Sequence, residues 1–324
     1  MTLFLDDAAV RAAFDWELAT SAVREAYATS VDAARYPARG MARGDHGWLR
    51  SLTGVPAGRE LMGAKIIAAA MPTRRASYLI PLFDQRTAEL VALLDGHSIT
   101  GYRTAATSAV AADLLSPPGA LTVAVIGSGF EAQNHVRALA VVRDLKAVRV
   151  YSPRPESRAR FVAELSDLPI TQAASAEEAL AGATLVVCAA RSRDETPTLL
   201  GKWLRPGMTV VSIGSTLPEQ REVDPEVIAR ADVIVADMVE EVLDDTGDLI
   251  AARAAGLDVA GKICSLADLV GERVPGRTHV DQIALYKSVG SAAQDLAVAG
   301  MCARNAERLG LGTRMPATIH PVQK

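Results

Sequence analysis

The chain has few of the residues that mark disulfide-stabilised, metal-binding or membrane proteins. Its 324 residues include three cysteines, Cys188, Cys264 and Cys302, which stand far apart and form no Cys-x-x-Cys pair. Its five histidines lack the His-x-x-x-His and His-Glu-x-x-His spacings of zinc sites, so we expect no metal. No apolar run approaches the ~20 residues that a membrane-spanning helix needs. These patterns predict reduced, partly buried thiols and no membrane partner.

Aromatic residues and net positive charge are also scarce. Aromatics make up 4% of the chain, so the core must be built mostly from Ala, Val, Leu and Ile. The formal net charge of −4 gives no support for binding to nucleic acid. The first seven residues include the acids Asp6 and Asp7, where a secretory signal peptide would have basic residues. We therefore expect a cytoplasmic globular protein with one large domain or two ordinary ones.

A glycine-rich turn in the middle of the chain is its most informative feature. The run Leu121–Gly127 predicts a buried strand, and Ser128-Gly129-Phe130-Glu131-Ala132 follows it into a helix. In such a turn the first glycine permits the tight bend, and the second lets backbone approach a pyrophosphate at the helix N-terminus. The pattern predicts a dinucleotide-binding site. A glycine turn in a fold without a cofactor is the alternative.

From Leu121 to about Asp237, short apolar segments alternate with amphipathic ones. The expected strands are Leu121–Gly127, Ala147–Ser152, Ile170–Ala174, Thr184–Ala190, Met208–Gly214 and Asp232–Asp237, and the expected helices include Glu131–Val142 and Pro155–Leu165. This alternation predicts an α/β fold with a Rossmann-type, doubly wound parallel sheet. Ligands of such sheets lie beyond the C-terminal strand ends, where Gly127, Ser152, Ala190 and Gly214 fall.

The first ~115 residues follow a different pattern. The expected elements are a helical start over Asp6–Ala34, strands over Trp48–Thr53, Leu61–Ala69, Ser77–Asp84 and Glu89–Asp95, and a helix over Thr100–Leu115. Ser116-Pro117-Pro118-Gly119 predicts the domain boundary. A last helix is expected to open at Tyr286 and run through Arg308. We expect it to return to the N-terminal half, so that residues 1–117 with 291–324 form a discontinuous α+β domain and 118–290 the dinucleotide-binding domain.

Three basic residues of the first domain stand in unusual settings. Lys65 lies in the otherwise apolar run Gly63–Pro72. The simpler interpretation is that its side chain extends to the surface. The alternative is a desolvated ammonium with a lowered pKa, which suits proton donation to a carbonyl or an imine nitrogen. Arg39 follows a proline in a loop, where a solvated charge is the simpler interpretation. Arg103 falls near a helix start, where a cation opposes the helix dipole and needs an anion such as a ligand carboxylate.

Two further basic features bear on the ligands. The segment Arg39–Arg50 is unusually basic, which indicates either a substrate with a second acid group or, more simply, a solvated hairpin. Ser152-Pro153-Arg154 ends the second strand of the dinucleotide fold without the acid that usually binds the ribose of NAD, and Arg158 follows. This favours NADP(H) over NAD(H), with a solvated surface arginine as the alternative.

Several segments together resemble a known family. They are Gly63-Ala64-Lys65, Leu94-Asp95-Gly96, Arg103–Ala109, Gly127-Ser128-Gly129, Ser175–Ala179, Ile213–Pro218 with Arg221-Glu222, and Lys287-Ser288-Val289-Gly290. In these segments the chain resembles the ornithine cyclodeaminase/mu-crystallin family along nearly its whole length. The resemblance implies a homodimer whose discontinuous N-terminal domain forms the dimer interface and supplies residues to the substrate.

The resemblance also implies roles for individual residues. On the substrate side it implies Arg39, Lys65, Arg103 and Gly290, with Lys65 as the catalytic proton donor. The predicted cofactor-binding residues are Arg103, Thr104, Gly127, Ser128, Gly129, Phe130, Glu131, Ser152, Arg154, Ser215 and Val289. Many members have Gln where this chain has Glu131, and an acid beside a pyrophosphate is unfavourable unless it points away.

One position departs from the family's cyclodeaminases. Those enzymes resemble one another in carrying an aspartate that interacts with the distal amine of the substrate. This chain has Thr216 at that position. A hydroxyl neither pairs with an ammonium as a carboxylate does nor acts as a base near neutral pH.

We therefore expect an NAD(P)H-dependent oxidoreductase acting on the C=N or CH–NH bond of a small imino or amino acid. A cyclodeaminase that uses another base, with NAD recycled, is one alternative. A protein of mu-crystallin type that binds NADPH without turnover is the other.

Overall fold

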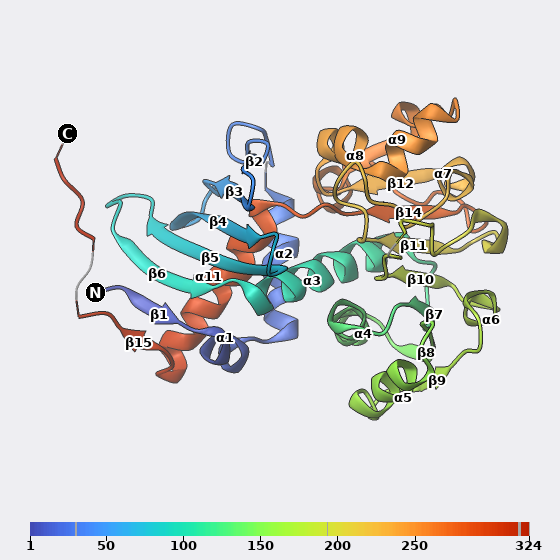
Figure 1. Ribbon diagram of the computed structural model, residues 1–324, viewed down its shortest axis with the longest axis horizontal. Coiled ribbons are helices and arrows are strands. Elements are labelled where there is room, and N and C mark those ends of the chain that lie inside the picture. Colours follow the sequence, from blue (N-terminus) through green and yellow to red (C-terminus); the bar gives the residue numbers. More distant parts are fainter. Residues whose placement is uncertain (30, 193, 317–318, 324) are drawn as a thin grey trace. The chain divides into compact units, whose positions relative to one another are not determined.

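The computed structural model of the chain forms two compact units (Figure 1). It describes residues 1–29, 31–192, 194–316 and 319–323. Unit 1 comprises Met1–Arg103 and Ser291–Lys324, and unit 2 comprises Thr104–Gly290. The first division therefore falls earlier than the predicted boundary at residue 117. It lies inside one helix, α3 (His97–Leu115), because that helix continues unbroken up to the Ser-Pro-Pro-Gly turn.

Unit 1 is built on a seven-stranded mixed sheet with the order β15-β1-β6-β5-β4-β3-β2. The strands are β1 (Leu3–Leu5), β2 (Gly40–Arg43), β3 (Gly47–Gly54), β4 (Leu61–Ala70), β5 (Arg75–Asp84), β6 (Leu90–Asp95) and β15 (Thr313–Arg314). Strands β2 to β6 form an antiparallel meander, and β1 joins β6 in parallel. The four strands expected in this half are therefore present.

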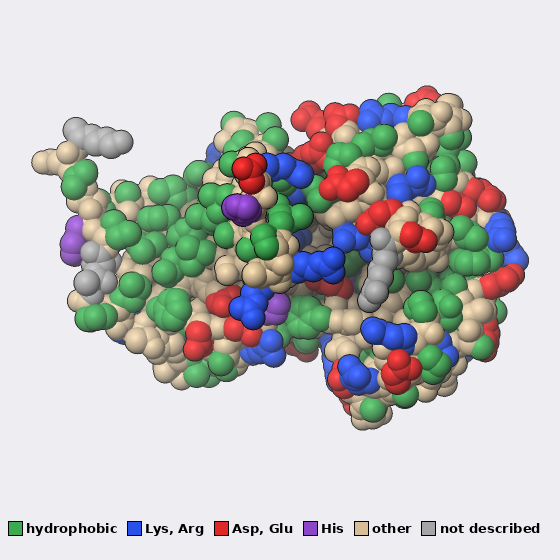
Figure 2. Space-filling view, in the orientation of Figure 1, with side chains coloured by type: hydrophobic (Ala, Val, Ile, Leu, Met, Phe, Trp, Pro, Cys, Tyr) green, Lys and Arg blue, Asp and Glu red, His purple; other side chains and the backbone are tan. Residues whose placement is uncertain are grey.

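Side chains of this sheet alternate between two faces. Leu52, Lys65, Ile80 and Leu94 are buried on the face against which α11 (Ala292–Leu309) and α1 (Asp7–Ala13) pack, with α2 (Trp16–Ala28) against α11. The opposite face carries more exposed apolar side chains, and hydrophobic side chains spread over this part of unit 1 in Figure 2. One face of the sheet is thus covered by helices from both ends of the chain.

Unit 2 is an eight-stranded parallel sheet with the order β13-β12-β14-β11-β10-β7-β8-β9, which confirms the predicted α/β fold. Its strands are β7 (Leu121–Ile126), β8 (Leu145–Tyr151), β9 (Ile170–Gln172), β10 (Leu185–Cys188), β11 (Thr209–Ser212), β12 (Val233–Ala236), β13 (Ile263–Ser265) and β14 (Ala284–Lys287). Its helices after α3 are α4 (Phe130–Val142), α5 (Pro155–Glu164), α6 (Ala176–Leu180), α7 (Pro225–Arg230), α8 (Val239–Asp245), α9 (Gly247–Ala254) and α10 (Leu266–Val270), with short 3₁₀ turns at Gly201–Trp203 and Ala260–Lys262.

The core of unit 2 matches the scarcity of aromatic residues. Its cluster of buried hydrophobic residues consists of Ala, Val, Leu and Ile apart from Cys188 and Met208. All three cysteines are free thiols, two of them buried. Among the residues that the structure describes, no helix is long and apolar enough to cross a membrane.

Two expected helices are wrong in part. Tyr286 and Lys287 belong to strand β14, inside the sheet, and the last helix begins only at Ala292. A short buried apolar run fits a strand or a helix equally well, so its periodicity does not decide between them. The helical start over Asp6–Ala34 is two helices, because Asp15 caps α2 by accepting a hydrogen bond from the Leu18 N–H. Ser30, within that stretch, lies outside the described residues.

Candidate functional site

The substrate-side lysine is paired with a buried carboxylate in unit 1. Lys65 Nζ lies 2.7 Å from Asp295 Oδ1, and Arg103 Nε lies 3.0 Å from the same oxygen. Lys65 comes from β4, Arg103 from the second turn of α3 and Asp295 from the first turn of α11. The Lys65 side chain is 1% exposed, so it does not extend to the surface. The simpler interpretation from the sequence, a lysine that extends to the surface, is therefore wrong, and the alternative of a desolvated lysine is correct.

Asp295 and its neighbours extend this cluster, and sequence reasoning missed them. Arg103 Nη1 donates to Gln294 Oε1 at 2.6 Å, and Gln294 Nε2 donates to the Tyr27 hydroxyl at 2.9 Å. The Tyr27 hydroxyl in turn is hydrogen-bonded to Ser291 Oγ at 3.1 Å. The available signal was a Gln-Asp pair among small apolar residues at the start of the last helix. The anion that Arg103 was expected to need is thus supplied, in part, by the chain itself.

The surroundings of Lys65 set its acidity. Burial and the positive charge of Arg103 lower its pKa, Asp295 opposes them, Arg39 lowers it slightly further, and the result is about 8. Arg39 is half-buried in the segment before β2. A buried ammonium with such a pKa is protonated at neutral pH and is a stronger acid than an exposed lysine, which suits a general acid.

The predicted dinucleotide turn lies at the C-terminal end of β7 in unit 2. Gly127 has φ of 116°, and a Cβ there would lie 2.5 Å from the Ala189 carbonyl oxygen, so only glycine fits. Gly129 is the N-cap of α4 without a side-chain cap, and a Cβ there would meet nothing within 4 Å. Ser128 Oγ is hydrogen-bonded to Ser152 Oγ at 2.9 Å. A tight turn, an open glycine and a helix start fit a dinucleotide pyrophosphate.

The residues that were predicted to bind the ribose of the cofactor, or its 2′-phosphate, follow the end of β8. Ser152 is buried, whereas Arg154 at the N-cap of α5 is exposed. Arg158, unlike the exposed Arg154, packs against the protein. Its guanidinium donates to the Ser152 carbonyl and lies 5.7 Å from the Tyr151 ring centroid. Of the other predicted residues, Thr104 is buried in α3, Phe130 is exposed and Glu131 is half-buried in the first turn of α4.

Val289 and Gly290 are held by an acid that the sequence reasoning did not single out. Asp237 follows β12, and its Oδ1 accepts from the Val289 N–H at 3.0 Å. Its Oδ2 accepts from the Gly290 N–H at 2.7 Å and from Ser288 Oγ at 2.6 Å. One carboxylate thereby fixes the backbone that follows β14. Ser215 was predicted to bind the cofactor, but its buried hydroxyl donates a hydrogen bond to the Gln220 carbonyl.

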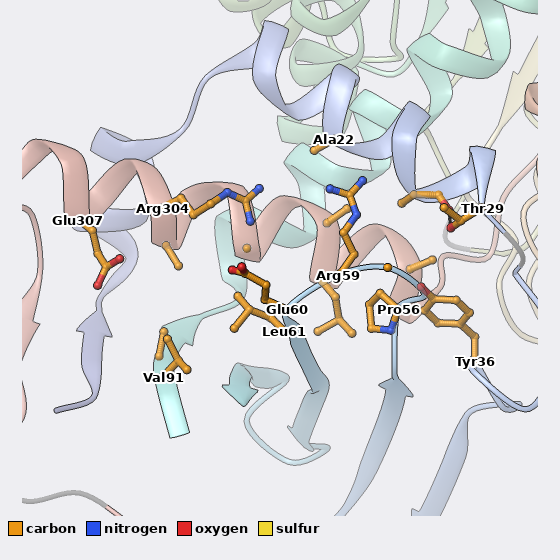
Figure 3. Close-up of a pocket in the computed structure, with 18 of the residues that line it drawn as sticks. Ala22, Thr29, Tyr36, Pro56, Arg59, Glu60, Leu61, Val91, Arg304 and Glu307 are labelled. Atoms are coloured by element: carbon orange, nitrogen blue, oxygen red, sulfur yellow. Dashed lines mark hydrogen bonds between the residues drawn. The ribbon is translucent and has the colours of Figure 1, made fainter. Parts of the chain in front are cut away.

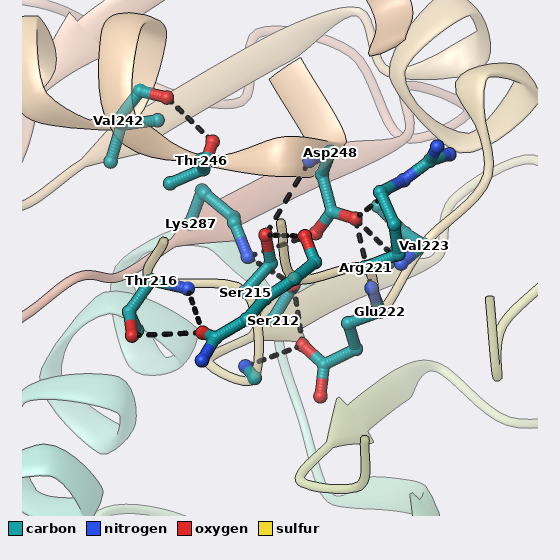
Figure 4. Close-up of polar contacts among 12 residues, drawn as sticks. Ser212, Ser215, Thr216, Arg221, Glu222, Val223, Val242, Thr246, Asp248 and Lys287 are labelled. Carbon is teal, nitrogen blue, oxygen red and sulfur yellow. Dashed lines mark hydrogen bonds and ion pairs between the residues drawn. The ribbon is translucent and has the colours of Figure 1, made fainter. Parts of the chain in front are cut away.

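A second cluster of buried charges lies under the turns that follow β10 and β11 (Figure 4). Lys287 Nζ lies 3.1 Å from Asp248 Oδ2 and donates to Ser212 Oγ at 2.9 Å, and Ser212 Oγ donates to Glu222 Oε2 at 2.6 Å. Lys287, Asp248 and Glu222 are all fully buried. Burial raises the pKa of Glu222 to about 7, although Lys287 opposes the rise.

The Glu222 carboxylate connects this cluster to the sheet edge where ligands of parallel sheets bind. It accepts from the Gly214 N–H at 2.8 Å and from the Ala190 N–H at 3.3 Å. A Cβ on Gly214 would lie 2.5 Å from Glu222 Oε1, so a side chain there would displace the Glu222 carboxylate. Thr216, in the same loop, has both its N–H and its hydroxyl bonded to Gln220 Oε1. The Glu222 carboxylate therefore helps to shape the loop that contains Thr216, the residue that replaces the aspartate of the cyclodeaminases.

Unit 1 also has a cavity of about 380 Å³ beside α2 and α11 that none of the predicted site residues lines (Figure 3). Its lining is largely apolar, with Arg59, Glu60, Arg304 and Glu307 among the lining residues. Arg59 is paired with Glu25 at 2.8 Å, and Glu307 with Arg314 at 3.0 Å. The cavity is separate from the Lys65 cluster.

Comparisons with known proteins agree with the expected family. The model of the ornithine cyclodeaminase/mu-crystallin family matches residues 20–309. Ketimine reductase mu-crystallin of Mus musculus is 31% identical over 230 residues, which cover 71% of this chain and 69% of that protein. A Delta(1)-pyrroline-2-carboxylate reductase of Bacillus cereus is 30% identical over 270 residues, covering 81% and 82%. The structure of the Thermococcus litoralis Delta(1)-pyrroline-2-carboxylate reductase with NADH and L-proline has a TM-score of 0.89, 26% identity, and coverage of 97% and 100%.

Replacing Lys287 by Met tests whether the second charge cluster holds unit 2 together. Removal of the ammonium leaves the buried Glu222 without its cation and leaves Asp248 with the longer contact to Arg221 Nε at 3.5 Å, so the free energy of unfolding should fall by ~3–5 kcal/mol. Denaturant unfolding followed by circular dichroism measures the change. Lys202→Met, at an exposed lysine of the same unit, is the control and should cost less than ~0.5 kcal/mol. Equal losses in the two variants would contradict the assigned role.

Proposed function

Because the chain belongs to the ornithine cyclodeaminase/mu-crystallin family, we propose that it is an NAD(P)H-dependent oxidoreductase acting on the C=N or CH–NH bond of a small imino or amino acid. Relatives that match over most of the chain are named as reductases of a ketimine and of pyrroline-2-carboxylate. The observation that carries the proposal for this chain is the buried ammonium of Lys65, paired with Asp295 and flanked by Arg103.

These residues supply the acid half of an imine reduction. Arg39 and Arg103 bind the substrate carboxylate, since guanidinium groups hold carboxylates through paired hydrogen bonds. Lys65 Nζ donates a proton to the substrate nitrogen, and Asp295 keeps that ammonium charged until the transfer. The bound dinucleotide supplies the hydride that the imine carbon gains, and the turn from Gly127 to Gly129 would hold its pyrophosphate. The orientation of the substrate by two fixed cations lowers the entropic cost of the reaction.

The loop after β11 argues against a cyclodeaminase. Thr216 has no carboxylate, and its hydroxyl is hydrogen-bonded to Gln220. Glu222 has a pKa near 7 and would suit a base, but its carboxylate is fully buried and bonded to Ser212 and Gly214. Neither Thr216 nor Glu222 therefore offers an unengaged carboxylate for a distal amine. A protein that only bound NADPH would also gain nothing from a desolvated lysine with a pKa near 8.

We propose NADP(H) as the favoured cofactor. Arg154 is exposed at the end of the second strand of the dinucleotide fold, where an arginine accommodates the 2′-phosphate, and that strand ends in Ser152 instead of an acid. A reduced dinucleotide and three free thiols fit a cytoplasmic location, which we propose as well.

We propose further that the chain forms a homodimer through the open face of the unit 1 sheet. Ile66 pairs with Leu79 across β4 and β5, and Leu49 pairs with Ala68 across β3 and β4, all on the face opposite Lys65. Leu49 and Leu79 are 50% and 38% exposed. An apolar sheet face of this kind is a typical interface, and a second copy supplies an equally flat, apolar surface.

The role of Lys65 is tested by Lys65→Met in the reduction of pyrroline-2-carboxylate by NADPH. The turnover number should fall at least ~100-fold, because the proton donor is lost. In the wild type, turnover should decline above about pH 8, since the reactive form is the ammonium and its pKa is about 8. Lys146→Met, at an exposed lysine, is the control. An unchanged rate in Lys65→Met, or a wild-type profile flat to pH 10, would remove Lys65 from the mechanism.

Arg154→Ala tests the cofactor assignment. Loss of the guanidinium should weaken NADPH binding by ~10-fold or more, and NADH binding much less, because only NADPH carries the 2′-phosphate. Nucleotide fluorescence titration gives both dissociation constants, with Arg160→Ala, an exposed arginine of the same helix, as the control. Equal losses of affinity for the two nucleotides would show that Arg154 does not bind the 2′-phosphate and is a solvated surface residue.

Leu79→Arg tests the dimer. A charge in the centre of the open sheet face should convert the wild-type dimer to a monomer at micromolar concentration, as measured by light scattering after size exclusion. Val141→Arg is a matched control, because Val141 is also 38% exposed but lies in unit 2. A wild-type monomer, or a Leu79→Arg dimer of undiminished stability, would refute this interface.

A further inference from the structure

Small side chains on two packed helices form the cavity beside α2 and α11 (Figure 3). Ala22 and Ala26 line it from α2, and Ala297 and Gly300 line it from α11. The nearest contact of a Cβ built on Gly300 would be Arg304 Nη1 at 3.4 Å, so a side chain would fit there. Protein interiors are otherwise close-packed, and a cavity of about 380 Å³ has the size of a site for a small ligand.

One buried hydroxyl group lines this cavity. It belongs to Tyr36, which is 2% exposed. Within the part of the chain that the structure describes, the Tyr36 hydroxyl has no hydrogen-bond partner. Burial raises the pKa of Tyr36, so the hydroxyl keeps its proton and can donate it. A buried tyrosine hydroxyl normally has a hydrogen-bond partner, which a ligand in the cavity would supply.

A second hydroxyl complements that of Tyr36. Thr29, at the end of α2, lines the cavity on the same side as Tyr36 (Figure 3). The Thr29 hydroxyl donates to the Ala26 carbonyl at 2.8 Å, so its oxygen is left to accept a hydrogen bond. Tyr36 thus presents a donor and Thr29 an acceptor. A carboxamide matches both, because its oxygen accepts hydrogen bonds and its NH₂ group donates them.

Two opposite charges line the cavity on its other side. Arg304 comes from α11 and Glu60 from the loop before β4, and both side chains are exposed. Figure 3 shows them across the cavity from Tyr36. Among the described residues, neither side chain has an ion-pair partner, whereas Arg59 and Glu307 of the same lining are paired. One cation and one anion match the carboxylate and the ammonium of an α-amino acid.

We propose that the cavity binds an α-amino acid with a carboxamide side chain, at a site separate from the Lys65 cluster. The ligand carboxylate pairs with Arg304, and its ammonium pairs with Glu60. The aliphatic part of its side chain packs against the alanines of α2 and α11. The carboxamide oxygen accepts from the Tyr36 hydroxyl, and the NH₂ group donates to Thr29 Oγ. The site binds its ligand without reaction, so it does not depend on the proposed function.

Isothermal titration calorimetry with L-glutamine and L-norleucine tests the proposal. L-Glutamine should bind the wild type at least ~10-fold more tightly, because L-norleucine has a side chain of similar length without the amide. Tyr36→Phe should reduce this preference to less than ~3-fold by weakening L-glutamine alone. Arg304→Gln should weaken both amino acids by ~3- to 10-fold. Arg308→Gln is the control, at an exposed arginine of α11 that is not among the lining residues.

Two further variants separate this site from the Lys65 cluster. Ala297→Leu fills the cavity from a half-buried position of α11 and should abolish L-glutamine binding. Lys65→Met changes the other cluster and should leave the affinity within ~2-fold. Unfolding temperatures without ligand show that each variant is folded. Absence of binding to the wild type, equal affinities for the two amino acids, or binding that persists in Ala297→Leu and is lost in Lys65→Met would overturn the inference.

Discussion

The ion pair between Lys65 and Asp295 is the interaction on which the rest of the structure depends. A lysine in the middle of an apolar strand is tolerated only if a counter-charge accompanies it into the interior. That counter-charge lies 230 positions away, on the last helix of the chain. The pair therefore gives a physical reason why the last helix leaves the dinucleotide-binding unit and packs on the N-terminal sheet. The same burial lowers the pKa of the lysine, so the structural requirement and the proposed chemistry have one cause.

Unit 2 also contains a buried ammonium that is paired with a carboxylate, and there the acids position backbone turns. Its buried ammonium, Lys287, sits at the end of a central strand and is balanced by Asp248 and, through Ser212, by Glu222. Here the carboxylate oxygens point to backbone N–H groups of the turns after β10 and β11. Asp237 does the same for the backbone after β14. Acids that accept hydrogen bonds from backbone N–H groups thus shape the turns at the C-terminal strand ends, where a dinucleotide would bind.

Local patterns in the sequence were sufficient for the strands from β7 to β12 of unit 2 and for the glycine turn, because apolar runs and turn residues act over a few positions. They were not sufficient for β13, which was not predicted, or for β14, because a short buried apolar run fits a strand or a helix equally well. Asp295 could not be found in this way either, because its partner lies in a distant segment. The burial of Arg50 could not be predicted either, because a basic hairpin seen alone is expected to be solvated.

Isotope transfer is the most direct test of hydride exchange at the α-carbon of an imino acid. The protein would be incubated with NADPH carrying deuterium at the transferable position of its nicotinamide and with pyrroline-2-carboxylate or the methylamine imine of oxaloacetate. Mass spectrometry of the amino acid product should show one deuterium on the α-carbon and consumption of one NADPH per product. Ammonia released from L-ornithine without net loss of cofactor, with no deuterium entering any imine, would contradict the account.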